Sequence, residues 1–545
     1  MSESFFGLNI AVRGLFTAQR SLDTVNHNLN NVNTPGYSRQ QSIQVASRPM
    51  ALYDGTGMMG TGSDVTGVTR VRDEYLDFKY WSENISLGEW DAKQEVLSEI
   101  EVTFNEPSDS GFTTIMSDFF SSLQELGKDP SSSAVRALVK QRGVTLAKYF
   151  NSTAAHFDDL QQDVNYKIQT KVEEVNSYAT QIQQLNRQIY ISELDGNTAN
   201  DLRDSRTLLV DKLSRIINID ANEVVYGQLP DGRDDKHFVI TISGKALVDH
   251  YSVSKLAVEQ RSAAEKVNDE DANNLYEIKW ADGNSLNIKG GELRGYLDVR
   301  DGNEGEAGTN GIASPNYKGI PYYQKKLNEF VRTFARAFNE GYIDTDGDKE
   351  FDATDYDGTG HSDGYGYNTT DDGVRFFTMK ATDNLPVSSD EFLDLAANPS
   401  PTANQIYDRY ELLTAKNFTV SEDIINDFNL IATSGTAGEA GNIDALNSIL
   451  DMRHNADMFS EGAPEDFMKS LVATLGIDSQ QAQNYQSNQQ VIVTQITNRR
   501  LSDSGVAIDE EMTNLVKFQQ AYNASAKMIQ TMGEIYDTLI NKLFV

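Results

Sequence analysis

The chain has 545 residues, too many for a single hydrophobic core, and its length suggests about three or four domains. Its 47 Lys and Arg residues are outnumbered by 81 Asp and Glu residues, and the net charge of −34 opposes binding to nucleic acid or to anionic lipid surfaces. Because there is no Cys, disulfides and thiolate chemistry are excluded.

The N-terminal residues do not resemble a cleaved secretion signal. Residues 1–22 lack a basic leader followed by an apolar core, and no stretch reaches about 18 apolar residues. We therefore expect a protein that is cytosolic or is exported by a route without a cleaved signal.

The first predicted helix carries an apolar heptad repeat in two rows. Leu8, Leu15, Leu22 and Leu29 form one row, and Ala11, Ala18, Val25 and Val32 form the other. Such a pattern is typical of a helix that packs along a partner helix. Asn26, Asn30 and Asn33 interrupt the apolar surface. The helix should end at Pro35-Gly36.

A glycine pattern follows at residues 55–60, where GTGMMG has the GxGxxG spacing of a dinucleotide-binding loop. That loop requires a strand before it and a helix after it. The next segment, TGSDVTGVTRV, contains valines and further glycines and lacks helical character. The sequence therefore disfavours dinucleotide binding.

Several helices are predicted between residues 90 and 215. An apolar face runs from Phe112 to Leu123, and Asp129-Pro130 interrupts it. A long amphipathic helix should then span about Ser133–Leu194 and end at 195–197, which read Asp-Gly-Asn.

The pattern changes to short strands from about residue 220. Phe238, Ile240 and Ile242 alternate on one face, and a turn at Asp282-Gly283 indicates further strands. Helical periodicity returns over residues 322–342, and helices resume after about residue 440.

An acidic loop, DTDGDKEFDATD, lies within the second irregular region at Asp344–Asp355. The calcium candidates in it are Asp344, Asp346, Asp348 and Asp355. An EF-hand loop has Gly at its sixth position and Glu at its twelfth, whereas this loop has Lys349 and Asp355. A solvated acidic loop is therefore the favoured interpretation.

The last forty residues repeat the heptad pattern with larger side chains. The rows are Ile508, Leu515, Tyr522, Ile529, Tyr536 and Leu543, and Phe518, Met532 and Leu539, with Ser525 as a polar interruption. Acidic residues at 509–511 lie near the predicted helix start, where they complement the helix dipole. A helix over residues 512–543 would be about 48 Å long.

Each terminal helix thus carries a long apolar seam made of its two heptad rows. Burial of these seams is favoured over exposure to water. We expect the terminal helices to pair with each other, with other copies of the chain, or with another protein. The simplest alternative is an ordinary intramolecular pair that closes one domain. The small residues of the N-terminal second row suit close approach by Phe518 and Tyr522.

No arrangement of catalytic residues stands out. The six His residues, at 27, 156, 237, 250, 361 and 454, form no HExxH pair, and no GxSxG motif occurs. No pair of carboxylates is singled out by its spacing. The sequence therefore predicts neither an enzyme nor a cofactor site, and no metal site beyond the calcium candidate.

The two ends of the chain together resemble the bacterial flagellar axial proteins, the rod, hook and hook-associated components. NHNLNNVNTPGYSRQ, at residues 26–40, is similar to their N-terminal motif, and residues 504–541 are similar to their C-terminal motif. Residues 57–77, which include part of the glycine pattern, also resemble this family. Interior segments at 105–139, 198–214, 290–301 and 417–434 narrow the resemblance to the hook-associated members. Departures are concentrated in 221–290 and 303–415.

This resemblance implies a mainly α fold with inserted β-rich outer domains, in which the N- and C-terminal helices pair in an inner coiled coil. The implied domains are an inner domain of 1–40 and 505–545, a mainly helical middle domain of 41–219, 291–340 and 425–504, and an outer β-rich or irregular domain of 220–290 and 341–424.

The same resemblance implies a structural protein of the hook–filament junction. Such proteins form a ring between the hook protein and hook-associated protein 3, and they leave the cell by flagellar type III export. A cytosolic chaperone binds their C-terminal helix beforehand. An extracellular location on the flagellum, after a transient cytoplasmic stage and without membrane insertion, is therefore expected.

The resemblance also implies two sets of contact residues. Contacts between subunits are expected at Leu8, Leu15, Leu22, Val25, Leu29, Val32, Asn26, Asn30, Asn33, Leu515, Phe518, Tyr522, Ile529, Met532, Tyr536 and Leu539. The export chaperone is expected at Leu515, Phe518, Tyr522 and Ile529. The alternatives are another axial protein, from the hook or the rod, and a flagellar scaffold that carries an adhesive or enzymatic outer domain.

Overall fold

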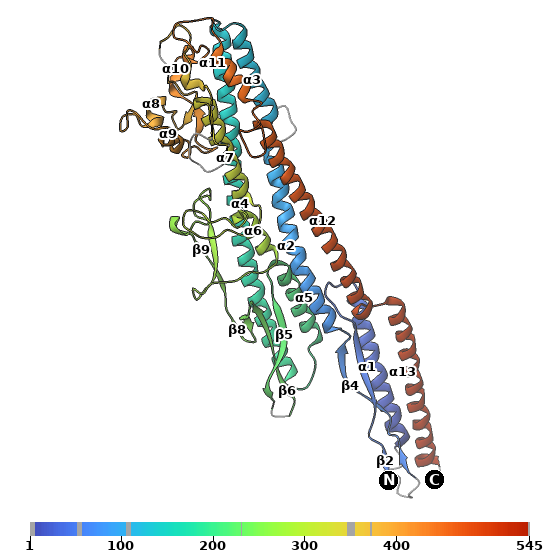
Figure 1. Ribbon diagram of the computed structural model, residues 1–545. Helices are drawn as coiled ribbons and strands as arrows, with labels where there is room; N and C mark the ends of the chain where they lie inside the picture. The colour runs from blue at the N-terminus through green and yellow to red at the C-terminus, as the bar shows by residue number, and fades with distance from the viewer. Residues whose placement is uncertain are drawn as a thin grey trace.

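The computed structural model describes residues 6–51, 57–104, 111–229, 232–345, 355–370 and 373–542. The molecule is long and narrow, and the two ends of the chain lie side by side at one tip (Figure 1). Within the described ranges, no helix is long and apolar enough to cross a membrane.

The tip that holds both termini is built from a helix pair. It consists of α1 (Phe6–Asn30) and α13 (Ile508–Asp537), and a short π-helical turn (Thr538–Lys542) follows α13. The two helices lie alongside each other (Figure 1). Three acidic residues lie in the first turn of α13, as the sequence indicated. Helix α1 ends at Asn30, and a turned segment carries the chain through Pro35-Gly36.

A β-hairpin covers one side of α1. Strands β1 (Gln40–Ala46) and β4 (Ser63–Arg70) are antiparallel, and between them lie β2 (Met50–Ala51) and β3 (Met58–Met59). The Ser21 and Ser42 hydroxyls are 2.9 Å apart, and Thr17 donates to the Ser63 carbonyl at 2.8 Å. The hairpin therefore packs on α1, although the sequence analysis assigned residues from 41 onward to the middle domain.

The glycine pattern at 55–60 leads into strand β4. A dinucleotide loop needs a helix at that place, because the helix N-terminus meets the pyrophosphate. Gly55 lies outside the described residues, and Gly57 and Gly60 flank the short strand β3.

The body is a bundle of long helices along the axis of the molecule (Figure 1). Its helices are α2 (Glu74–Phe104), α3 (Phe112–Lys128), α4 (Ser133–Glu193), α5 (Asn200–Ile216), α6 (Glu292–Asp301), α7 (Ile320–Glu340), α11 (Asp444–Met452) and α12 (Pro464–Ser504). The predicted helix over 133–194 is confirmed by α4, which has 61 residues. Helix α12 packs along α2 and leads back to the terminal pair.

A small β region lies against α4. Strands β5 (Asp220–Gln228), β6 (Asp234–Ile242), β7 (Lys245–Asp249) and β8 (Ser252–Val253) form an antiparallel sheet in that order, and β9 (Leu256–Gln260) pairs with β10 (Tyr276–Trp280). The Asn176 amide of α4 donates to the Leu256 carbonyl at 2.8 Å. The strand predicted from alternation at 238–242 is confirmed by β6.

The far end of the body contains short elements. They are β11 (Tyr342–Ile343), β12 (Tyr356–Asp357), β13 (Phe377–Met379), β14 (Phe418–Val420), α8 (Ser389–Leu393), α9 (Ala403–Tyr410) and α10 (Glu422–Asn426). Phe377 and Phe418 pack on the aromatic core of the bundle, with ring centroids 5.8 Å from Phe119 and 5.9 Å from Phe150. The described parts of residues 341–424 thus contribute to the body's core, whereas the sequence analysis placed 341–424 in an outer domain. The mainly α fold with β insertions is confirmed.

Candidate functional site at the terminal helix pair

The face of α1 that meets α13 is made of small residues. A Cβ atom placed on Gly14 would lie 3.1 Å from the Ser525 hydroxyl, and one placed on Gly7 would lie 2.8 Å from the Met532 methyl group. These contacts run in opposite directions along the two helices, so the pair is antiparallel. Ala11 and Ala18, on the same side of α1, are 3% exposed. The small row therefore lets the two helix backbones approach closely.

The large side chains of the pair remain incompletely covered. The predicted contact residues with half-buried side chains are Leu8, Leu15, Leu22, Leu29, Val32, Leu515, Phe518, Tyr522, Ile529, Met532 and Tyr536. Val25 is buried, and Leu539 is 47% exposed. Leu543 lies outside the described residues. Two helices alone cannot enclose a seam of this kind, because each helix shields the other from one side only.

Further apolar side chains are exposed along α13 and its extension. They are each 45–63% exposed: Ile508, Met512, Val516, Met528, Ile535, Leu539 and Ile540. Exposed apolar residues in isolation are common, but this many on one helix mark an interaction surface.

One asparagine of the NHNLNNVNTPGYSRQ segment holds the pair to its surroundings. The Asn28 side chain is buried, donates to the Glu511 carboxylate at 3.1 Å and donates to the Gln40 carbonyl at 2.9 Å. Its carbonyl oxygen accepts from the Tyr37 hydroxyl at 2.8 Å and from the Gln40 amide at 2.9 Å. Burial, together with nearby Asp201, Asp204 and Glu511, raises the Tyr37 pKa and keeps its hydroxyl a donor.

The predicted asparagines behave differently. Asn26, Asn30 and Asn33 are all exposed in the single chain, and Asn28 is not among the residues predicted from the sequence. A signal for Asn28 exists in the sequence, because the row of Gly7, Gly14 and Ser21 reaches Asn28 at the next step of seven.

A buried ionic cluster joins the terminal pair to the body. Asp204 of α5 accepts from the Ser38 amide and hydroxyl, each at 2.8 Å, and from the Arg70 guanidinium at 2.9 Å. Arg72 donates to the same Ser38 hydroxyl at 2.9 Å and makes two 2.8 Å bonds to Asp77. Segments before and after the β-hairpin are thereby fixed to α2 and α5.

The returning chain joins the same cluster through α12. Arg500 contacts Asp77 at 2.8 Å and Asp211 at 3.0 Å, and Asp211 also accepts from the Trp81 indole at 2.6 Å. Burial raises the pKa of Asp211, and Arg500 opposes that shift. Buried charges of this kind are tolerated because each has several partners.

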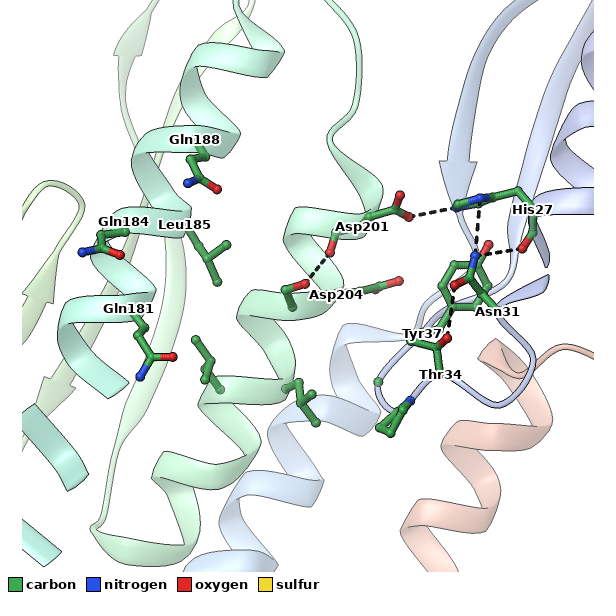
Figure 2. Close-up of a pocket in the computed structure, with 15 residues that line it drawn as sticks. His27, Asn31, Thr34, Tyr37, Gln181, Gln184, Leu185, Gln188, Asp201 and Asp204 are labelled. Carbon is green, nitrogen blue, oxygen red and sulfur yellow. Dashed lines mark hydrogen bonds and ion pairs between the residues drawn. The ribbon is translucent and has the colours of Figure 1, made fainter. Parts of the chain in front are cut away.

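A groove opens beside this connection, with a volume of about 510 Å³. It lies between α4 and α5 on one side and the turned segment after α1 on the other, and Asp201 bridges to His27 at 3.3 Å (Figure 2). It is lined by His27, Asn31, Thr34, Pro35, Gly36, Tyr37, Gln181, Gln184, Leu185, Gln188, Asp201, Asp204, Ser205, Leu208 and Leu209. Gly36 has a positive φ of 79°, and a Cβ there would crowd Leu208 at 3.2 Å.

The calcium candidate gains no support as a cluster. Asp346 and Asp348 lie outside the described residues. Asp344 accepts from the Tyr407 hydroxyl at 2.9 Å, and Asp355 accepts from the Thr345 amide at 2.8 Å. In the described part of the chain, no three His, Asp or Glu residues are grouped so that they could hold a metal ion.

Comparison with protein families finds matches at both ends and in the body. Residues 8–37 match the family described as flagella basal body rod protein, and residues 497–543 match the C-terminal region of the flagellar basal body rod FlgEFG proteins. Residues 97–348 match the helical domain of flagellar hook-associated protein FlgK.

Relatives align over nearly the whole chain. Flagellar hook-associated protein 1 of Bacillus subtilis is 29% identical, with 100% of this chain and 99% of that protein covered. The protein of the same name from Escherichia coli is 28% identical over 98% of this chain and 99% of its own length. The solved flagellar hook junction protein FlgK from Burkholderia pseudomallei covers 78% of this chain and all of its own, with a TM-score of 0.51 and 14% identity, a likeness of fold.

The paired terminal helices and their two family matches define a flagellar axial protein. With the match of the body and the full-length relatives, the class narrows further: over nearly its whole length the chain is similar to flagellar hook-associated protein 1. The resemblance found in the sequence is thereby confirmed.

Proposed function

We propose that copies of this chain form a ring at the hook–filament junction and act as an adaptor between the hook protein and hook-associated protein 3. The observation that carries the proposal is the incomplete burial of the terminal pair, in a chain whose body has a closed core. Two observations support this placement at the hook–filament junction. The relatives are named flagellar hook-associated protein 1, and the solved protein with a similar fold is described as a hook junction protein.

The subunit contacts in this proposal are made by the incompletely covered apolar side chains of the terminal pair. They are the half-buried side chains of the seam from Leu515 to Tyr536 and the exposed apolar side chains between Ile508 and Ile540. Burial of each large apolar side chain contributes about 1.5–3 kcal/mol. The exposed Asn26, Asn30 and Asn33 supply hydrogen-bonding groups to neighbouring subunits or to a central channel that the ring would surround.

Export precedes assembly in the same proposal. A cytosolic chaperone covers Leu515, Phe518, Tyr522 and Ile529, which requires α13 to separate from α1. These four side chains are only half-buried, so opening the pair exposes little additional apolar surface to water. Such a separation therefore has a low cost in free energy. The chain then passes through the flagellar type III apparatus and folds its terminal pair against neighbours outside the cell. Its role is structural, with neither catalysis nor a cofactor.

Deletion of the gene, followed by electron microscopy of the cells, tests the proposal. We expect hooks without filaments, with filament protein shed into the medium. Expression of a chain that lacks 1–40 or 505–545 should leave that defect in place, although the body folds. Intact filaments in the deletion strain would contradict the proposed function.

A further inference from the structure

The groove beside the ionic cluster has an apolar floor that the chain leaves open. Leu185 of α4 and Leu208 and Leu209 of α5 are half-buried along it. Exposed Gln side chains of α4 form one rim, and the turned segment at 31–37 forms the other (Figure 2). Its volume of about 510 Å³ lies within the range of about 300–1,000 Å³ typical of binding pockets.

Two aromatic side chains stand exposed on the first two turns of α2. Tyr75 is 69% exposed and Phe78 is 43% exposed. Tyr75 points away from the neighbours of α2, because Trp81 and Asn84 bond to α5, and Tyr80 lies under Arg500 of α12. Phe78 packs edge-to-face on Trp81 of its own helix, with ring centroids 5.4 Å apart, and leaves its outer part exposed. No residue of α2 lines the groove, so a chain does not fill its own groove with these rings.

The aromatic pair and the groove lie at the same level along the molecule. Arg72, three residues before Tyr75, bonds to the Ser38 hydroxyl, and Ser38 bonds to Asp204 in the groove wall. Copies placed side by side would therefore bring the aromatic pair of one chain to the height of the groove of the next.

The chemistry of the two surfaces is complementary. The Asp201 side chain at the groove edge is 62% exposed and can accept from a phenol hydroxyl or an ammonium group. Tyr75 supplies the phenol hydroxyl. Lys79, which is exposed one turn further along α2, supplies the ammonium group. The leucine floor suits the ring of Phe78.

We propose that Tyr75 and Phe78 of one copy insert into this groove of a second copy. The inference rests on the proposed ring and names one contact within it. Because the two surfaces differ, the contact is head-to-tail, and such contacts close into rings when the rotation permits. The contact also braces the junction between the terminal pair and the body of the neighbouring subunit.

Engineered cysteines test this contact directly, because the natural chain has none. The full chain with Tyr75→Cys and Gln184→Cys is expressed in its bacterium, and isolated flagella are oxidised. We expect a ladder of disulfide-linked oligomers on a non-reducing gel, absent from either single variant. A control pair uses Tyr166→Cys, at an equally exposed site on α4, with Gln184→Cys.

The outcomes separate this contact from the ring itself. A ladder from the first pair alone supports the contact. If the protein is present in flagella but gives no ladder, the proposed contact is wrong. An equally strong ladder from the control pair also overturns the contact. Neither result contradicts the proposed ring. If flagella from cells with the natural chain do not contain the protein, the proposed function fails as well.

A groove-filling substitution gives a second readout that does not depend on disulfides. Ser205 is exposed on α5 and lines the groove, so Ser205→Phe should block it without disturbing the core. We expect about tenfold fewer filaments per cell, as for loss of an interface hot spot. Thr170→Phe, exposed on α4 outside the groove, is the control and should keep the natural number. Equal filament numbers in the two variants would overturn the contact.

Discussion

The helical body and the terminal pair contain similar apolar side chains but bury them to different extents. Phe119, Phe150 and Phe330 of the body are completely buried. In the terminal pair, Tyr522 and Ile529 are half-buried, and Val516 is 52% exposed. The body therefore encloses a core within one chain, whereas the pair lacks neighbours on most sides. Heptad periodicity alone does not distinguish these two cases, since both place apolar residues along one helix face.

The body should lose the most stability when its aromatic core is opened. Phe330 stacks on Phe150 at 5.3 Å, on Phe459 at 5.2 Å and on Phe334 at 5.7 Å. We expect Phe330→Ala to lower the free energy of unfolding by about 3–5 kcal/mol, measured by urea denaturation. Phe16→Ala in α1, where the ring is 60% exposed, is the matched control and should change it by less than about 0.5 kcal/mol. Equal losses in the two variants would remove the contrast between body and pair.

Acid should weaken the body through a buried histidine. His361 is 1% exposed, its Nε2 accepts from the Ala432 amide at 2.9 Å, and its Nδ1 lies 2.7 Å from the Val374 carbonyl. Burial lowers the pKa of His361 from 6.5 to about 4. As pH falls, His361 of the unfolded chain takes up a proton before His361 of the folded chain does. The free energy of unfolding therefore decreases between about pH 6.5 and pH 4.

The size of this acid effect is up to about 3 kcal/mol, from the displacement of the pKa. His361→Phe removes the titrating group and should flatten the fall in unfolding free energy between pH 6.5 and pH 4, relative to the natural chain. Urea denaturation at several pH values measures both slopes. The same slope in both proteins would show that His361 carries no part of the acid sensitivity.

The attachment of the terminal pair should depend on Asn28. Asn28→Ala leaves Glu511, Tyr37 and the Gln40 backbone without a buried partner, at a cost of about 1–3 kcal/mol. Hydrogen exchange at the Gln40 amide, which bonds to Asn28 at 2.9 Å, should speed up accordingly. Asn30→Ala, at an exposed position two residues away, should leave that exchange unchanged. Unaltered exchange in Asn28→Ala would contradict the assigned role.

The close approach of α1 and α13 should fail when the small row is enlarged. Gly14→Val adds a side chain where Ser525 lies 3.1 Å from the Cβ position, and overpacking costs about 1–3 kcal/mol. We expect loss of the pair, seen as faster hydrogen exchange in α13, with an unchanged urea midpoint for the body. A lowered body midpoint would show that pair and body unfold together.

Sequence periodicity was sufficient for the long elements. The heptads located α1 and α13, and amphipathic spacing located α4 to within a residue at each end. Ala11 and Ala18 of the small second row are buried, and the expected approach of Phe518 and Tyr522 to that row stays a prediction. Local patterns serve well here because a helix face is specified by residues three, four and seven apart.

The junction with the body was not predictable in the same way. Asp204, Arg500 and Asp77 come from three distant parts of the chain, and no local pattern brings them together. The asparagine cluster drew attention to Asn26, Asn30 and Asn33, whereas burial selects Asn28. Residues 341–424 have an irregular, acidic sequence, yet Phe377 and Phe418 within this range pack in the body core.

Hydrogen exchange measured on the full chain, as a monomer and within isolated flagella, tests most directly whether the terminal pair depends on its neighbours. We predict that amides of α13 exchange at least about a hundredfold faster than those of α4 in the monomer, and become protected in flagella while α4 changes little. Protection of α13 as strong as that of α4 in the monomer would contradict the account.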